Sequence, residues 1–357
     1  MRIAVQTVSS VVAGLGLLLL AGCASVGPAT VTRDRFDYVT TISDSWKRQT
    51  LLNLLKVRYA DAPVFMDVSS VISSYSLEGD VSLGGQFATS GGSNIGTVGA
   101  TGRYADKPTI TYQPLIGDKF AKSLMAPIPV TGILSLIQSG YPADIVMRIC
   151  VNSINGLENA FGGAGSPRAG DPKFHELMTA MHESQASGSM GFRVKVVDDK
   201  QAVVMFMRPT NEQAALHGRA IGELLGLDTS EREFSVLYGS FPANDREIAV
   251  LTRSLLQVMA DLASYVDVPA TDIAEGRVSD PRRSEEQQRL FPPLIAVRQG
   301  SSPPDDAHVA VPYRNGWFWI DDRDQRSKLM LNFLMFIFSL TEGGPSQGAP
   351  IVTVPAR

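Results

Sequence analysis

The sequence predicts an α+β fold in which helices alternate with antiparallel β-hairpins, one of them long, glycine-rich and amphipathic. Two observations predict this class. Apolar residues recur at helical spacing in several segments, as Leu51, Leu54 and Leu55 do. Residues 75–87 instead alternate between apolar or small residues and polar ones, which is the period of a strand. Turn-forming residues gather between such segments, most densely at 156–170.

The N-terminus has the pattern of an export signal. Met1-Arg2 gives a short basic start, and an apolar run from Val11 to Leu20 follows it. That run is too short to span a bilayer as a helix and has the length of a signal-peptide core. We therefore expect residues 1–22 to be a signal peptide. Residues 23–33 show no clear periodicity, so we expect them to form a tether.

The signal closes with Leu20-Ala21-Gly22-Cys23. This stretch resembles the lipobox of bacterial lipoproteins, which implies cleavage before Cys23, a diacylglycerol on its sulfur and an acyl chain such as palmitate on its new amine. Three acyl chains hold a protein to a membrane essentially permanently, because two already suffice. Ala24 stands where an Asp would resemble an inner-membrane retention signal. The resemblance therefore implies an outer-membrane lipoprotein, which we expect to face the periplasm.

Charge and cysteine content exclude some partners and bonds. The formal net charge is −4 without a basic stripe, whereas nucleic-acid binders need cations to neutralise phosphates, so we expect no nucleic-acid partner. The chain has two cysteines. If Cys23 is acylated, Cys150 has no internal disulfide partner. Cys150 lies in the apolar run 145–151, where we expect a buried structural thiol rather than a nucleophile.

The first predicted region, residues 34–155, is helical and carries the long hairpin at about 73–113. Its predicted helices are Phe36–Tyr59, Lys119–Met125, Val130–Ser139 and Ala143–Ile154, and a strand is predicted at Val64–Ile72.

The long hairpin has the most regular pattern in the chain. A turn at Gly91-Gly92 places Asp80 opposite Arg103 and Leu83 opposite Ala100, so that acid meets base and apolar meets apolar. Two interpretations stay open: membrane-spanning strands with apolar-out, polar-in alternation, and a soluble hairpin with one face on the core. The predicted polar face carries Glu78, Asp80 and Arg103, and the predicted apolar face carries Tyr75, Leu77, Val81, Leu83, Phe87, Val98, Ala100 and Tyr104.

Two further regions follow the loop at 156–170. Residues 171–266 predict a small α+β domain, and residues 290–357 predict a C-terminal region of strand and helix. The predicted helices are Lys173–Gln185, Glu212–Leu225, Ile248–Tyr265 and Gln325–Leu340, and the predicted strands are Gly191–Val197, Ala202–Arg208, Phe234–Tyr238, Tyr313–Ile320 and Ile351–Val354.

Three phrases spread along the chain carry a second resemblance: 58–65 (RYADAPVF), 137–142 (IQSGYP) and 318–324 (FWIDDRD). They are similar to phrases of a proteobacterial family of outer-membrane lipoproteins that has no established activity. The resemblance therefore implies a location for the protein and no chemistry.

No set of residues forms a convincing catalytic or metal-binding pattern. Ser346 lies in G-x-S-x-G, but a predicted helix precedes it where a nucleophile elbow needs a strand, and no His follows it. His175 and His182 can share a helix face but have no third ligand. The Asp-rich stretch 321–324 lacks the spacing of a calcium loop and suits the start of a helix. We therefore expect no enzyme, no cofactor and no metal site.

Two functions from different classes remain. The first is a non-enzymatic outer-membrane lipoprotein with a structural, assembly or secretion-related role in the cell envelope, oligomeric through its long hairpin. A lipid anchor combined with a long amphipathic hairpin is similar to the layout of the curli secretion lipoprotein, without a match in sequence. The second is a periplasm-facing scaffold or ligand-binding lipoprotein with no membrane-inserted strands. The expected partners are the membrane, through the anchor, and further copies of the chain or another envelope protein.

Overall fold

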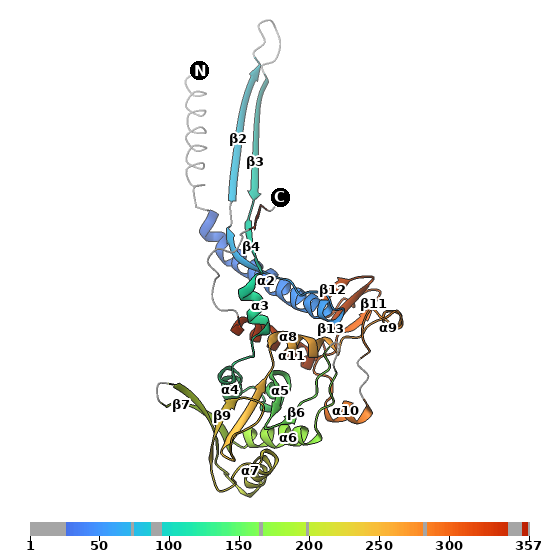
Figure 1. The fold of residues 1–357 in the computed structure, drawn as a ribbon. Coiled ribbons are helices and arrows are strands. Elements are labelled where there is room, and N and C mark those ends of the chain that lie inside the picture. The colour runs from blue at the N-terminus through green and yellow to red at the C-terminus, as the bar shows by residue number, and fades with distance from the viewer. Residues whose placement is uncertain are drawn as a thin grey trace. The chain divides into compact units, whose positions relative to one another are not determined.

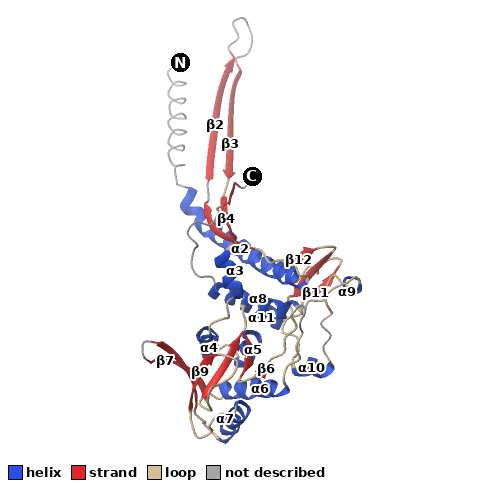
Figure 2. Ribbon diagram, in the orientation of Figure 1, coloured by secondary structure: helices blue, strands red, loops and turns tan. Residues whose placement is uncertain are grey.

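The computed structural model describes residues 26–72, 75–86, 95–163, 167–197, 200–280, 284–341 and 352–355 (Figure 1). The predicted α+β class is confirmed, because helices accompany sheets that are mostly antiparallel (Figure 2). The chain divides into two compact units. The first unit contains residues 1–43, 66–114 and 349–357, and the second unit contains residues 44–65 and 115–348.

The first unit holds two sheets. A three-stranded sheet has the order β1-β4-β14, and a separate two-stranded sheet is the hairpin β2-β3. β14 pairs antiparallel with β4, so the predicted C-terminal strand is confirmed. The bounds are β1 Phe65–Ile72, β2 Tyr75–Gln86, β3 Ile95–Asp106, β4 Thr109–Leu115 and β14 Val352–Pro355.

Helix α2 (Val26–Arg58) begins earlier than the sequence predicts. Residues 26–33, expected to belong to a tether, are helical. Pro28 falls in the first turn of α2, where the N–H that proline lacks has no partner within the helix. The expectation of a tether is therefore corrected from Val26 onward, and Cys23 lies outside the described residues.

The largest sheet of the second unit has the order β6-β5-β10-β9-β8-β7. β9 and β10 run parallel, and the other neighbouring strands are antiparallel. Strands from both sides of the predicted boundary at 156–170 pair in this sheet, so that loop does not separate two sheets. The bounds are β5 Val151–Ile154, β6 Leu157–Glu158, β7 Met190–Val197, β8 Lys200–Met207, β9 Glu233–Tyr238 and β10 Glu247–Thr252.

Helices of the second unit include α11, which confirms the helix predicted near the C-terminus. They also include α7, which has the predicted bounds. The bounds are α3 Asp118–Met125, α4 Val130–Gln138, α5 Ala143–Cys150, α6 Pro172–Ala186, α7 Glu212–Leu225, α8 Leu255–Ala263, α9 Ala270–Ala274, α10 Glu285–Leu290 and α11 Gln325–Thr341.

The prediction of a helix over Ala143–Ile154 is wrong after Cys150, because α5 ends there and β5 follows. Asn155 and Gly156 have φ angles of 47° and 83° and turn the chain from β5 into β6. Asn-Gly is a strong signal for a two-residue hairpin turn. The helical interpretation of the preceding apolar run overlooked that signal.

The prediction of a helix over Ile248–Tyr265 is wrong in its first part. Residues 247–252 form β10, which lies between β5 and β9 in the sheet. Residues 248–250 are all buried, and a short continuous apolar run fits a buried strand as well as a helix. Ser254 forms a capping box at the start of α8, and this local signal marks the true boundary.

A three-stranded sheet of the second unit has the order β11-β13-β12. The prediction of one strand over Tyr313–Ile320 is wrong, because Arg314 and Asn315 form a turn that brings Tyr313 opposite Gly316. Arg314 accordingly has a positive φ of 52°. The bounds are β11 Arg298–Gly300, β12 Ala307–Tyr313 and β13 Gly316–Asp321.

The described hydrophobic core lies in the second unit. The predicted stripe on α2 is confirmed, because Leu51, Leu54 and Leu55 are each 0% exposed. Helix α11 also faces this core through Leu331 and Leu334. Among the hairpin side chains that the structure describes, none from β2 or β3 belongs to the core.

Candidate functional site

The β2-β3 hairpin is the candidate interaction element of the first unit. Each strand has 12 residues, and the pairing runs from Tyr75 opposite Asp106 to Gln86 opposite Ile95. Within the described ranges no third strand pairs with either one, so each strand keeps one edge of open N–H and C=O groups. A lone two-stranded hairpin is at best marginally stable in water. The open edges therefore suit pairing with another chain.

The prediction that Asp80 lies opposite Arg103, and Leu83 opposite Ala100, is wrong by two residues. The pairing is centred between residues 90 and 91, one residue before the predicted centre. A shift of two residues keeps every side chain on its own face, so the alternation cannot distinguish the two registers. The observed partners are Thr101 for Asp80 and Val98 for Leu83.

In the observed register, the residues predicted for each face still lie on the same side of the hairpin. Glu78 lies opposite Arg103, which places an acid directly across from a base. Asp106 interrupts the apolar face, because it is the partner of Tyr75. Phe87 lies outside the described residues. The apolar pairs are Leu77 with Tyr104, Val81 with Ala100, and Leu83 with Val98.

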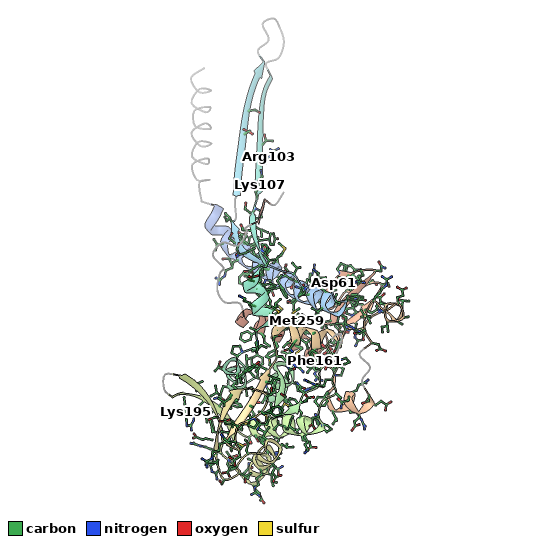
Figure 3. All side chains as sticks on the ribbon, viewed as in Figure 1. Asp61, Arg103, Lys107, Phe161, Lys195 and Met259 are labelled. Atoms are coloured by element: carbon green, nitrogen blue, oxygen red, sulfur yellow. The ribbon has the colours of Figure 1, made fainter. Side chains whose placement is uncertain are left out.

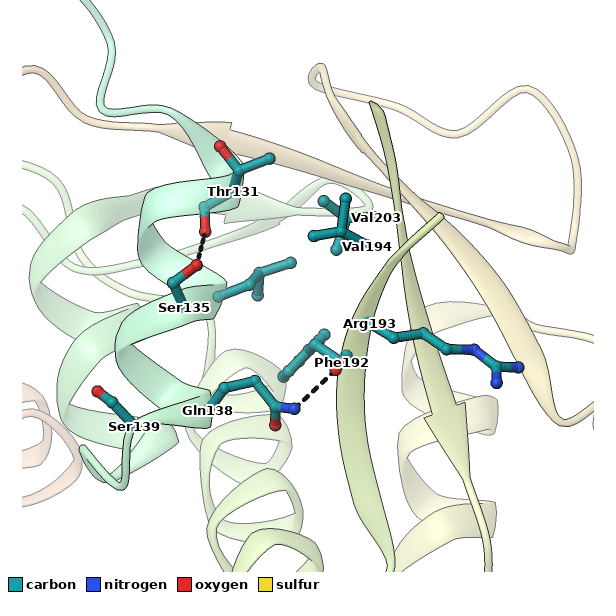
Figure 4. A pocket seen from close by; sticks show the side chains of 9 residues that line it. Thr131, Ser135, Gln138, Ser139, Phe192, Arg193, Val194 and Val203 are labelled. Carbon is teal, nitrogen blue, oxygen red and sulfur yellow. Dashed lines mark hydrogen bonds between the residues drawn. The ribbon is translucent and has the colours of Figure 1, made fainter. Parts of the chain in front are cut away.

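A groove between α4 and the edge strand β7 is the second candidate site, and it belongs to the second unit. Its volume is about 410 Å³. Gln138 Nε2 donates to the carbonyl oxygen of Phe192 at 2.7 Å and thereby ties the helix to the strand edge at one end (Figure 4). The groove is lined by Thr131, Leu134, Ser135, Gln138, Ser139, Phe192, Arg193, Val194 and Val203.

The groove combines apolar surface with hydroxyl groups from α4. Val194 is 53% exposed, whereas the hydroxyl of Ser135 donates to the backbone oxygen of Thr131 at 2.8 Å. Such a surface suits an extended apolar ligand or peptide better than a charged one. The sequence analysis missed this site. A signal was present, since Thr131, Ser135 and Ser139 recur every four residues along one helix.

Comparison with protein-family models, with curated proteins and with solved structures finds no match to this chain. Of the helices in the described ranges, none combines the length and the apolarity of a membrane-crossing segment. Any assignment of function therefore rests on the residues themselves.

The His and Asp residues weighed as metal ligands each have an ordinary neighbour. His182 Nδ1 lies 2.9 Å from Asp144 Oδ1, and the His175 ring packs edge-on against Phe291. Asp324 caps α11 by accepting from the Ser327 backbone N–H at 3.0 Å. Across the described residues no group of three or more His, Cys, Asp or Glu could hold a metal ion. Ser346 lies outside the described residues.

A buried arginine that the sequence analysis missed forms several hydrogen bonds in the second unit. Arg253 is 0% exposed and forms an ion pair with Asp261, with Nη1 3.0 Å from Oδ2. Its remaining donors bond to Asn152 and to the backbone oxygens of 148, 149 and 160. Asp261 in turn accepts from the Gly162 backbone N–H at 2.6 Å. A buried and saturated arginine holds the 148–162 segment in place and is unsuited to bind a ligand.

The interpretation of Cys150 as a buried thiol is confirmed. It closes α5 and is 0% exposed. Burial raises its pKa to about 12, while the charge of Arg253 acts in the opposite direction. A thiol with such a pKa is protonated at neutral pH and therefore unreactive.

The RYADAPVF phrase forms the joint at the end of α2. Asn53 holds Val64 by two hydrogen bonds, one from its amide nitrogen to the Val64 oxygen and one from the Val64 N–H to its own oxygen. The Tyr59 hydroxyl donates to Asp272 Oδ2 at 2.6 Å. Burial first, and this bond second, raise the pKa of Tyr59. Asp61 accepts from the Tyr313 hydroxyl. The phrase therefore has a structural role in the second unit.

Proposed function

We propose that this chain is a non-enzymatic outer-membrane lipoprotein, anchored through acylated Cys23 and facing the periplasm. In this proposal several copies each contribute a β2-β3 hairpin to a shared, membrane-inserted β-structure with an assembly or secretion role. The observation that carries it is a 12-residue antiparallel ribbon without a third strand among the described residues. The lipobox supports the anchor, and the open strand edges support the sharing.

The length of the hairpin suits a membrane. Twelve residues at about 3.4 Å each give a ribbon of about 40 Å. Tilted by about 40°, as barrel strands are, it rises about 30 Å, which equals the hydrocarbon thickness of a bilayer. The alternation of Leu77, Val81 and Leu83 with polar residues agrees with one lipid-facing and one water-facing side.

The polar face of the hairpin is open to solvent. Asp80, Ser82, Thr101 and Arg103 are all exposed, as a water-filled lumen or a free surface requires. A hairpin that packed one face on a core in the manner of a soluble sheet needs a third element across that face.

The anchor is tested by metabolic labelling with a palmitate analogue. The wild-type chain should take up the label and fractionate with membranes, and Cys23→Ser should lose both properties. Cys150→Ala is the matched control, because it removes the other cysteine and should label like wild type. Label retained on Cys23→Ser would contradict the anchor.

The shared β-structure is tested by the mass of the detergent-extracted chain. Multi-angle light scattering should show a discrete oligomer, and a variant with residues 75–106 replaced by a short turn should be monomeric. A wild-type monomer at all detergent concentrations would contradict the proposal.

The groove between α4 and β7 favours a second candidate function, a periplasmic ligand-binding lipoprotein. Its apolar surface next to hydroxyl groups fits an extended apolar ligand. An apolar fluorescent dye should then bind the wild type and bind Val194→Glu at least tenfold more weakly. Leu237→Glu, at a similarly exposed position on β9, is the control. Equal dye binding by both variants would exclude the groove.

A further inference from the structure

The charges of the hairpin differ between its two strands. On one face β2 carries Glu78 and Asp80, whereas β3 carries Arg103 and is followed by Lys107. The one acid of β3, Asp106, lies on the other face. The side chains of Asp80, Arg103 and Lys107 are exposed, and Figure 3 labels the two basic residues. On this face the β2 edge of the ribbon is therefore acidic and the β3 edge is basic.

We propose that β2 of one copy pairs antiparallel with β3 of the next copy, so that the acidic edge meets the basic edge. This inference rests on the proposed function, because it names the partner of each open strand as a second copy of this chain. Asp80 of one copy then lies against the Arg103 side of its neighbour. The partner follows from charge complementarity between the two edges.

The alternative symmetric arrangements bring like charges together. In a two-fold pairing of β2 with β2, the acids Glu78 and Asp80 of both copies share one seam, and pairing β3 with β3 does the same for Arg103. Like charges across neighbouring strands are destabilising. Head-to-tail pairing is the arrangement that joins opposite charges at every seam. Repeated around a closed ring it leaves no open strand edge.

The glycines of the hairpin give the charges a further role. β2 and β3 contain glycine at 79, 84, 85, 96, 99 and 102. Glycine-rich strands specify their register weakly, because few side chains interlock. Charges at fixed positions on both edges therefore select the register as well as the partner.

The experiment uses full-length variants in detergent, with the oligomer measured by light scattering. Asp80→Lys places a base in the acidic strand beside Glu78, and Arg103→Glu places an acid in the basic strand. Each variant alone should lose the discrete oligomer. When the two are co-expressed with different tags, the new lysine at position 80 of one should pair with the new glutamate at position 103 of the other. A mixed oligomer containing both tags should then return.

The double variant Asp80→Lys/Arg103→Glu separates pairing between copies from pairing within one hairpin. It exchanges the charges at positions 80 and 103 and should assemble alone. If the double variant forms the oligomer but the two co-expressed single variants do not, the charges pair within one hairpin. That result would overturn the inference. Single variants that assemble like wild type would also overturn it. A wild-type chain that is monomeric would instead contradict the proposed function itself.

Circular dichroism and urea unfolding keep the test independent of misfolding. All three variants change exposed residues of the first unit, so the core of the second unit should unfold as it does in the wild type. If a variant loses the oligomer but keeps this unfolding midpoint, the substitution has disrupted the pairing of strands between copies and not the fold. The inference is overturned if oligomer loss always accompanies a lowered midpoint.

Discussion

Arg253 and Asp261 form a buried ion pair in the second unit, with Nη1 3.0 Å from Oδ2 and side chains 0% and 4% exposed. Arg253 directly follows β10, and Asp261 lies on α8. The pair fixes the start of α8 against the 148–162 segment, because Arg253 also bonds to the backbone oxygen of Ala160.

Asp261→Ala should lower the free energy of unfolding by about 3–5 kcal/mol, because it leaves the Arg253 charge buried without its partner. Urea unfolding of the detergent-solubilised chain, followed by tryptophan fluorescence, measures the change. Asp322→Ala removes an exposed carboxylate from its pair with Lys328 and should leave the midpoint unchanged. Equal effects of both variants would show that burial of the Arg253 pair has no energetic consequence.

Ala60 and Gly226 make a reciprocal pair of tests, since both follow a helix in the left-handed conformation, with φ of 59° and 67°. Ala60→Gly should stabilise the protein by about 0.5–1 kcal/mol, because glycine adopts this conformation without strain. Gly226→Ala should cost a similar amount, and no atom lies within 4 Å of the added methyl group. Thermal unfolding of the two variants and the wild type measures the direction of each change in melting temperature. Two shifts in the same direction would contradict the left-handed conformation at one of the two positions.

Cys150 should make stability fall at alkaline pH. Burial raises the pKa of the folded thiol to about 12 from an ordinary value of 9.0. Between these values the unfolded chain holds fewer protons than the folded one, so stability is full below pH 9 and decreases as pH rises. At pH 10 the loss is about 1.4 kcal/mol.

Cys150→Ala lacks this contribution and is the control for every other titrating group. From pH 7 to pH 10, the difference in unfolding free energy between the wild type and Cys150→Ala should decrease by about 1.4 kcal/mol. A difference that stays constant over this range would mean that the thiol ionises alike in both states.

Local signals explain what the sequence predicted well. Helix α7 was predicted with its observed bounds because both of its ends are marked locally. Asn211 accepts from the Ala214 N–H at the start, and Gly226 adopts a left-handed conformation at the end. The faces of the hairpin followed in the same way from alternation within the strands.

Signals that depend on distant residues explain what the sequence did not predict. Residues 248–250 read as helix because nothing local shows that β5 and β9 flank them on both sides. The Arg253 network joins residues more than ninety positions apart, and the groove needs α4 placed beside β7. The hairpin register was missed by two residues for a different reason, since alternation is blind to even shifts.

Val81→Lys and Ser82→Lys distinguish the two faces of the hairpin. Val81 lies on the predicted lipid-facing side, where a lysine at the middle of the bilayer costs about 2–4 kcal/mol. We expect Val81→Lys to reduce the discrete oligomer strongly while the second unit keeps its unfolding midpoint. Ser82→Lys, on the polar side, should assemble nearly as the wild type does. A lowered midpoint for Val81→Lys would instead support a core-packed hairpin.

The most direct measurement is a cysteine accessibility scan along β2 in a Cys150→Ala background. Single cysteines at positions 77–84 would carry a fluorescent probe, and a lipid-soluble and an aqueous quencher would be compared in proteoliposomes. The account predicts a period of two, with odd positions quenched from the lipid and even positions quenched from water. Quenching by the aqueous reagent alone at every position would contradict a membrane-inserted hairpin.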